Sequence, residues 1–189
     1  MSDIHSAVRV DKNVCPSVHS WNNKAGRFLW SIAWLLLFRP SPWFWHAGRR
    51  QLLRIFGARV GNDVKIMPSV RIWAPWNITL GDHAAVSHEV DLYLVDNISI
   101  GSHATVSQRA FLCTASHDID HPNMPLITAP IVIENGAWVC AEVYVHPGVT
   151  IGVDAVAGVR SAVFRNVPPR HVVGGNPARF IRNRNLTDK

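Results

Sequence analysis

Cysteine is scarce in this sequence. Only three occur among 189 residues, at Cys15, Cys113 and Cys140, and they lie far apart. An odd number of isolated cysteines excludes a disulfide framework, and no two of them have the close spacing of a zinc-binding pair. We therefore expect reduced, mostly buried thiols in a cytoplasmic protein.

Long apolar segments are also missing. The apolar stretch at residues 28–38 has eleven residues, which is too few to span a bilayer. The first residues, MSDIHSAVRVDKN, lack the basic start and apolar core of a secretory signal peptide. Charged residues make up 17% of the chain and hydrophobic residues 48%, a composition that indicates a globular protein with a substantial core.

Acidic side chains are almost absent from two segments that flank the middle of the chain. Residues 24–65 contain eight basic residues and one acidic residue, and residues 160–189 contain seven basic residues and one acidic residue. The middle, residues 66–159, contains two basic and nine acidic residues. This asymmetry indicates either solubility alone or two separate anionic partners. No nucleic-acid recognition motif accompanies the charge, so nucleic acid is not an expected partner.

A six-residue period organises the sequence from Val60 onward. Aliphatic residues recur at steps of six, six and eight from Val60 to Leu112, and at steps of six from Ile133 to Val163. Neither the 3.6-residue period of a helix nor the two-residue period of a strand produces this spacing. Three units predict one coil of a triangular prism, in which each unit is a short parallel strand with its aliphatic residue pointing inward.

The predicted main domain is therefore an all-β parallel β-helix. Its strands stack about 4.8 Å apart in successive coils, so that each coil buries the core of the next. We expect about five coils, at residues 60–77, 80–97, 100–117, 133–150 and 151–168.

The repeat is interrupted immediately after His117. An insertion in such a prism must leave from a corner and project outward, here as a loop at residues 118–132 rich in Pro, Asp and His. We expect His117 at that corner, stacked above Asn97 of the coil below. Histidine has an unperturbed pKa of about 6.5 and can accept a proton near neutral pH, which suits a general base.

Three segments resemble the O-acetyltransferase branch of the hexapeptide-repeat family, which includes nodulation, maltose and galactoside acetyltransferases. They read SHDIDHPNMPLI, IVIENGAWVCAEVYVHPGVTIG and VVGGNPARFIR. The likeness is greatest to acetyltransferases of colanic-acid-type exopolysaccharide biosynthesis, and it covers residues 24–184. It implies a left-handed β-helix, against the usual handedness of parallel crossovers, and a homotrimer with acetyl-CoA between neighbouring prisms.

The resemblance also implies roles for individual residues. His117 matches the catalytic base. The residues expected to contact acetyl-CoA are Trp138 beside the pantetheine arm, Arg165 and Arg179 at the phosphates, Asn176 near the adenine and Ser161; arginine forks suit phosphate oxygens. The acceptor side is expected at Ser87, Glu89 and Asn97. The predicted function is acetyl-CoA-dependent O-acetylation of a sugar hydroxyl in an exopolysaccharide repeat unit, the sugar being free or lipid-linked.

The ends of the chain complete the expected domain organisation. Residues 1–57 form a tail and a tryptophan-rich helical cap, residues 58–168 form the β-helix, and residues 169–189 form a tail that ends in a short helix. The N-terminal helices either cover the open end of the first coil or contact the inner face of an anionic membrane. The expected location is the cytoplasm, with peripheral membrane contact under the second interpretation.

Two other functions fit the same repeat. A metal-dependent hydratase resembling the gamma-class carbonic anhydrases would need converging histidines, but the likeness of the C-terminal segment to a CoA site argues against it, and we expect no metal. A non-enzymatic scaffold explains the repeat but neither the interruption after His117 nor the basic C-terminal segment. Metal analysis and a CoA-binding measurement distinguish the three.

Overall fold

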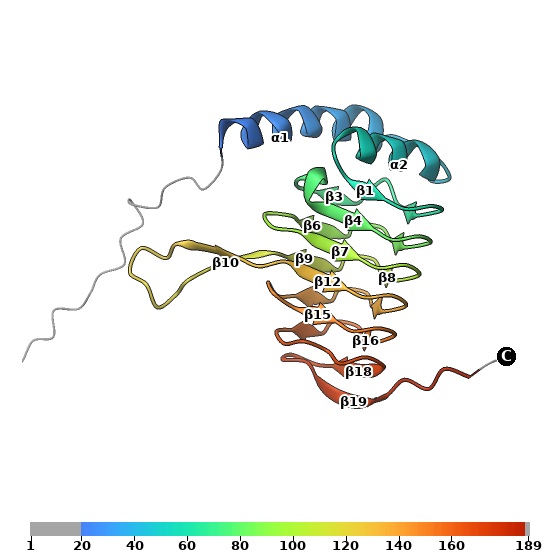
Figure 1. Ribbon diagram of the computed structural model, residues 1–189, viewed down its shortest axis with the longest axis vertical. Helices are drawn as coiled ribbons and strands as arrows, with labels where there is room; N and C mark the ends of the chain where they lie inside the picture. The colour runs from blue at the N-terminus through green and yellow to red at the C-terminus, as the bar shows by residue number, and fades with distance from the viewer. Residues whose placement is uncertain (1–19, 188–189) are drawn as a thin grey trace, which may run out of the picture.

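The computed structural model describes residues 20–187, so Cys15 lies outside the described residues. The chain forms a left-handed parallel β-helix of about six turns, with two helices across its N-terminal end (Figure 1). Helix α1 (Trp21–Ala33) continues into a π-helical segment, Trp34–Phe38, and α2 (His46–Ile55) follows. None of the helices within residues 20–187 has the length and apolarity needed to cross a membrane.

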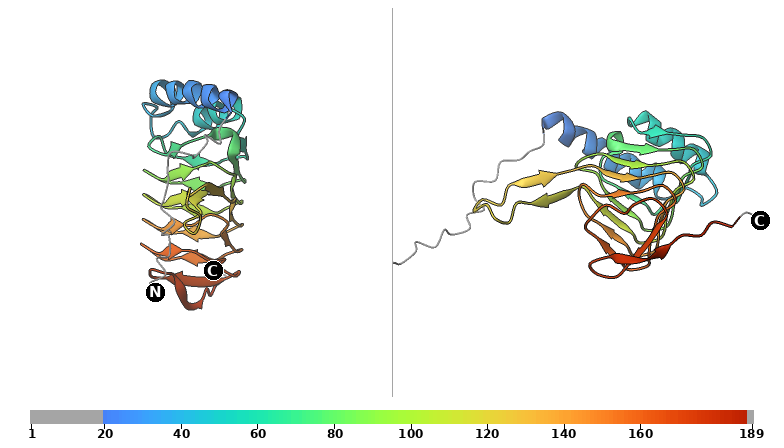
Figure 2. Two further views of the ribbon diagram at one scale, coloured as in Figure 1. Left: turned by 90° about the vertical axis from the view of Figure 1, so that its left-hand side faces the viewer. Right: turned by 60° about the horizontal axis from the view of Figure 1, so that its bottom comes forward.

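Three sheets form the sides of the prism, whose stacked coils are visible in Figure 2. Sheet A contains β1 (Arg59–Val60), β4 (Ile78–Leu80), β7 (Ile98–Ile100), β12 (Ile131–Ile133) and β15 (Thr150–Ile151). Sheet B contains β2 (Lys65–Ile66), β5 (Ala85–Val86), β8 (Thr105–Val106), β13 (Trp138–Val139), β16 (Val156–Ala157), β18 (His171–Gly174) and β19 (Arg179–Asn183). Sheet C contains β3 (Arg71–Ile72), β6 (Asp91–Tyr93), β9 (Phe111–Cys113), β14 (Tyr144–Val145) and β17 (Ala162–Val163), and a 3-10 turn, Pro75–Asn77, precedes β4.

The strand register confirms the predicted repeat. In sheet A, Val60 pairs with Leu80, Leu80 with Ile100, Ile100 with Ile133 and Ile133 with Ile151, all in parallel. The aliphatic positions of the repeat are buried, except that Val60 in the first coil is half-buried. Strand β18 pairs in parallel with β16 and extends the prism beyond the five predicted coils.

The N-terminal end of the prism presents a row of backbone carbonyls, because each coil's N–H groups donate to the carbonyls of the following coil. The cap meets this edge with side chains that can only donate. On sheet C, the indole of Trp30 donates to Ile72 O at 2.6 Å and that of Trp34 to Val70 O at 2.9 Å.

Arginines complete the same cap. Arg49 donates to Ile66 O at 2.7 Å, Arg50 to Val64 O at 3.1 Å, and Arg54 to the carbonyls of Val60 and Gly61. The N-terminal helices therefore cover the open end of the first coil. Three of the eight basic groups in residues 24–65 are used here to satisfy a sheet edge.

The C-terminal end differs from the prediction. The short helix expected after Pro177 is wrong: the chain forms β19, which turns back to pair antiparallel with β18. Ala162 N donates to Gly175 O at 3.0 Å, and Ala178 N to Ala162 O at 2.8 Å. The last N–H groups of the prism thus find acceptors in a hairpin and its turn, where a helix would leave them without strand partners.

Candidate active site

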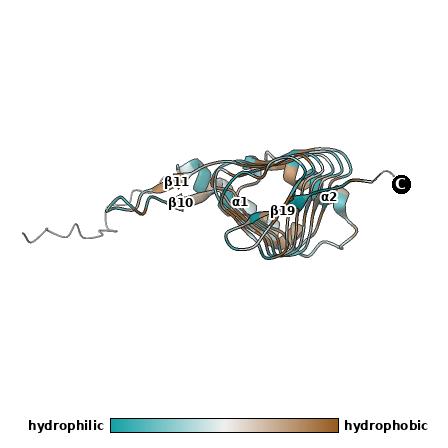
Figure 3. Cartoon of the chain, turned by 90° about the horizontal axis from the view of Figure 1, so that it is seen from below, coloured by the Kyte–Doolittle hydropathy of each residue, from teal (hydrophilic) through white to brown (hydrophobic). Residues whose placement is uncertain are grey.

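A two-stranded arm projects from the corner between sheets C and A. It consists of β10 (Ala115–His117) and the antiparallel β11 (Leu126–Thr128), with His117 opposite Leu126. Figure 3, seen along the prism, shows the arm leaving one corner, with α1 on the same side of the prism. At the base, the buried hydroxyl of Thr114 donates to Tyr93 O at 2.7 Å and accepts from Asp96 N at 2.9 Å, which fixes the point of departure.

His117 lies on the arm itself, not at the corner. The chain leaves the coil at Ala115, three residues earlier than the expected loop at 118–132, and the coil resumes with β12 at Ile131. Because Ile98 pairs with Ile131, Pro130 occupies the register position above Asn97. The expected stacking of His117 on Asn97 is therefore wrong: pairing with β11 draws His117 outward.

The imidazole of His117 is exposed and held by one ring nitrogen. Its Nδ1 lies 2.6 Å from the carbonyl oxygen of Met124. A carbonyl can only accept, so Nδ1 carries the proton and donates it. In the neutral ring, Nε2 then bears the free lone pair and can accept a proton.

Apart from Asn176 and Arg179 at the C-terminal end, the other candidate residues lie in two groups on the prism. Asn97 and Arg165 follow sheet C strands, at the same corner as the arm. Asn97 is exposed, and its backbone N–H donates to Asp96 Oδ1 at 2.7 Å. The second group lies on sheet B or at the corner between sheets B and C, and consists of Ser87, Glu89, Trp138 and Ser161. One chain therefore does not bring all the candidates together.

Within the second group, the side chains differ in availability. Trp138 on β13 is exposed, and its indole donates to Ser107 Oγ at 2.9 Å. Glu89 is exposed at a corner position with a φ of 57°, and its backbone N–H donates to Ser69 Oγ. The hydroxyl of Ser161 is buried and donates to Gly158 O at 2.5 Å, so it serves the turn.

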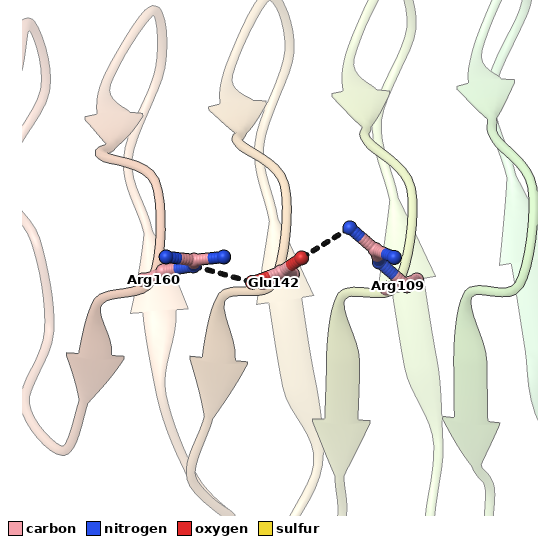
Figure 4. A network of polar contacts seen from close by, with 3 residues as sticks. All are labelled: Arg109, Glu142 and Arg160. Atoms are coloured by element: carbon pink, nitrogen blue, oxygen red, sulfur yellow. Dashed lines mark hydrogen bonds and ion pairs between the residues drawn. The ribbon is translucent and has the colours of Figure 1, made fainter.

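The corner between sheets B and C carries a ladder of ion pairs across three successive coils. Glu142 accepts from Arg109 on one side and from Arg160 Nε, at 2.5 Å, on the other (Figure 4). The hydrogen bond from Arg160, with the positive charge of Arg109, holds the pKa of the Glu142 carboxyl below its ordinary value near 4.5.

At the C-terminal end, Arg165 and Arg179 line one cavity of about 570 Å³. The apolar residues Phe164, Val167 and Phe180 share its wall. Asn176 is exposed in the adjoining turn and precedes Pro177 through a cis peptide bond. This end of the prism combines guanidinium groups with apolar surface, which suits a ligand with phosphates and a flat ring.

Residues 20–187 contain no cluster of three or more His, Cys, Asp or Glu side chains that could hold a metal ion. The histidines that a hydratase would need are spread over the fold. His88 lies 3.1 Å from Ser69 Oγ, His121 accepts from Asn123 N in the arm, and His146 lies against Phe164.

A second cavity, between α1 and sheet C, was not predicted. It has a volume of about 490 Å³, and Arg27, Arg71, Trp73, Asp91 and Tyr93 are among its lining residues. A signal was present in the sequence: Arg71 and Asp91, like Trp73 and Tyr93, occupy equivalent outward positions in successive coils. The contribution of Arg27 could not be read from the repeat, because it lies on a helix.

Known proteins resemble this chain in sequence. WcaF of Escherichia coli strain K12, assigned by its name to colanic acid biosynthesis as an acetyltransferase, is 44% identical over 160 residues, which cover 85% of this chain and 88% of WcaF. The galactoside O-acetyltransferase of the same strain is 30% identical over 144 residues, 75% of this chain and 71% of that protein. No family model matches the sequence.

Solved structures agree with these relatives. A hexapeptide-repeat acetyltransferase from Vibrio cholerae superposes with a TM-score of 0.80 at 30% identity, covering 87% of this chain and 93% of that one. A galactoside acetyltransferase in complex with coenzyme A gives 0.81 at 25% identity, covering 89% and 86%. The fold and the relatives define an acyltransferase built on a β-helix. The chain belongs to the hexapeptide-repeat acetyltransferases, and the predicted family and enzyme class are confirmed.

Proposed function

We propose that this protein transfers the acetyl group of acetyl-CoA to a sugar hydroxyl, with His117 as the general base. The observation that carries the proposal is the contact between His117 Nδ1 and Met124 O. It leaves Nε2 as a proton acceptor on an exposed arm, beside a rigid corner. A sugar hydroxyl is a weak nucleophile until a base removes its proton during attack.

The proposed reaction has two steps. The acceptor hydroxyl oxygen attacks the thioester carbonyl while its proton passes to His117 Nε2. The tetrahedral intermediate collapses as the carbon–sulfur bond breaks, and the sulfur leaves with the proton returned by His117. The products are an O-acetyl ester and free CoA, and His117 is again neutral.

The donor is expected to lie along the prism toward its C-terminal end. Arg165 and Arg179 line one cavity, and their guanidinium groups suit the phosphates of CoA. Trp138 offers an exposed apolar surface for the pantetheine arm, while Asn176 and the turn at Ser161 shape the adenine end. A similar structure from Vibrio cholerae, 29% identical to this chain, was solved in complex with acetyl-CoA, which supports acetyl-CoA as the donor.

The site would be shared between chains of a homotrimer. His117, Asn97 and Arg165 lie on one corner, whereas Ser87, Glu89 and Trp138 lie on sheet B or its other corner. In a cyclic assembly, one corner of each prism faces a different corner of its neighbour. A groove between chains would therefore unite both groups, with Ser87, Glu89 and Asn97 toward the acceptor.

The acceptor is proposed to be a sugar of an exopolysaccharide repeat unit, carried on a lipid at the membrane. The identity of 44% to WcaF supports this substrate class. The outer side of the cap supports peripheral contact with an anionic membrane, because the side chains of Trp21, Phe28, Leu35 and Trp43 are each more than 60% exposed there.

The test is transfer of radiolabel from acetyl-CoA. Purified protein is incubated with colanic acid oligosaccharides freed of acetyl groups by mild base, with galactosides, or with no acceptor. The parent should label a sugar, and His117→Ala should lose about 10²–10⁴-fold in turnover while the Kd for CoA stays unchanged. Equal turnover of His117→Ala and parent would rule out the base, and no labelled sugar would rule out this acceptor class.

A further inference from the structure

A cavity lies where α1 crosses the outer face of sheet C. It remains open, with a volume of about 490 Å³, although the indoles of Trp30 and Trp34 already bind the strand edge beside it. Its floor is formed by the outward side chains of the first two coils, among them Trp73 and Tyr93, whose rings meet edge to face at 5.5 Å.

One polar group in this cavity lacks a partner. The guanidinium of Arg27 lies 4.1 Å from the ring centre of Trp73, but its Nε is buried and has no hydrogen-bond partner among the described residues. A buried donor without an acceptor is unfavourable, because it has lost its hydrogen bond to water. The cost is removed when a bound molecule supplies an acceptor oxygen at this position.

The rest of the lining favours a polar, ring-shaped ligand. Arg71 and Asp91 face each other at 3.9 Å across the first two coils and together offer both donors and acceptors. The faces of Trp73 and Tyr93 are apolar. A pyranose ring has apolar C–H faces and a rim of hydroxyls, so it matches aromatic walls combined with a carboxylate and guanidinium groups.

Helix α1, which lines the cavity, and the β10–β11 arm, which carries His117, lie toward the same side of the prism (Figures 1 and 3). Tyr93 pairs with Cys113, and the arm begins two residues later at Ala115. Since coils stack about 4.8 Å apart, the cavity floor is about 5–10 Å below the base of the arm, and His117 lies a further ~7 Å outward along β10. One sugar ring is too small to fill the cavity and also reach His117.

We propose that this cavity is a second acceptor subsite, which binds one sugar unit of an extended glycan while another unit presents its hydroxyl to His117. The proposal rests on the proposed function. It makes the enzyme selective for acceptors longer than one sugar, and the spacing between cavity and arm determines which unit is acetylated.

The experiment compares Arg27→Met with the parent. Methionine keeps an unbranched apolar side chain beside Trp73 and removes every N–H group. Arg59→Met makes the same change at an exposed position of the first coil, on sheet A, as a matched control. The probes are a de-O-acetylated colanic acid oligosaccharide of one repeat unit and the methyl glycosides of its constituent sugars. Binding is measured calorimetrically without acetyl-CoA, and KM is measured with it. Thermal unfolding of both variants checks the fold.

In Arg27→Met, the Kd and KM for the oligosaccharide should rise about 10-fold or more, as for a lost hydrogen bond to a charged group. The KM values for the methyl glycosides and acetyl-CoA should not change, and Arg59→Met should behave as the parent. The subsite is overturned if a folded Arg27→Met variant binds the oligosaccharide as tightly as the parent does. It is also overturned if the parent binds the methyl glycosides as tightly as the oligosaccharide. If the parent transfers no acetyl group, the proposed function is contradicted, but the binding measurement still tests whether the cavity binds the oligosaccharide.

Discussion

Arg49 is the only charged residue that is fully buried in residues 20–187. Its Nε donates to Ile66 O, its Nη1 to Pro42 O and Ser41 Oγ, and its Nη2 to Trp43 O, each at 2.7 Å. Burial lowers the pKa of the guanidinium. A single planar donor group thus joins the connection between α1 and α2 to the open edge of sheet B.

Replacing Arg49 by Ala should lower the free energy of unfolding by about 3 kcal/mol or more, because several carbonyls would lose their donor at about 1–3 kcal/mol each. Arg49→Lys should recover little of this, since an ammonium cannot bond in several directions of one plane. Chemical denaturation measures the change. Arg59→Ala, at an exposed position of the first coil, is the control. Equal stability of both Ala variants would contradict the role of Arg49.

Glu142 predicts a dependence of stability on pH. Because its pKa is lower in the folded state than the ordinary value near 4.5, its contribution is fully present above that value and disappears as pH falls through the folded pKa. Glu142→Gln should therefore have a lower Tm than the parent at pH 7, and the difference should shrink below about pH 4. A difference in Tm that is constant from pH 7 to pH 3 would show that the ladder does not act through charge.

His117 and Arg27 show which contacts could be predicted from the sequence and which could not. The interruption of the repeat after His117 was enough to select this residue, and the structure places it on the projecting arm. Its partner, Met124 O, could not be predicted, because the pairing of β10 with β11 carries no repeat signal. Arg27 was missed for a similar reason: its position over Trp73 depends on how a helix crosses the first coil.

At the level of elements, the period of six predicted the strands well because each inward side chain is buried by the same stacking. The C-terminal segment has no such period. The turn residues Gly175, Asn176 and Pro177 are compatible with a helix or a hairpin, and the choice depends on the unpaired edge of sheet B. That edge is a feature of the assembled prism, so the local sequence could not reveal it.

The cap allows a direct test of membrane contact. Each Lys or Arg near an anionic surface contributes about 1 kcal/mol, and salt screens it. Since Arg49, Arg50 and Arg54 bind the first coil, much of the attraction must come from exposed apolar side chains. The protein should sediment with anionic liposomes at low salt and be released in part by high salt.

The matched variants for this test change two exposed apolar residues at either end of the prism. Leu36→Ser with Trp43→Ser alters the cap, and Val159→Ser with Ile181→Ser alters the far end; all four side chains are more than 60% exposed. Only the cap variant should lose liposome binding, and its transfer to a soluble acceptor should persist. If the parent does not sediment with anionic liposomes at low salt, the N-terminal helices serve only as a cap on the prism.

For the whole molecule, the separation of the candidate residues has a consequence for assembly. His117 and Trp138 belong to different sides of one prism, and the rigid stacking of coils prevents them from approaching within a chain. If both serve one reaction, each active site takes His117 from one chain and Trp138 from its neighbour. An isolated prism would then hold two half-sites and be inactive.

This arrangement predicts complementation between two inactive variants. His117→Ala and Trp138→Ala, coexpressed with different tags in equal amounts, should form mixed trimers. A site is intact only where a chain with His117 adjoins a chain with Trp138, which occurs at about one site in four for random assembly of a cyclic trimer. The mixture should therefore recover about a quarter of the parent's activity, well above the sum of the two variants assembled separately. Light scattering that finds an active monomer, or coexpression that recovers nothing, would contradict a site shared between chains.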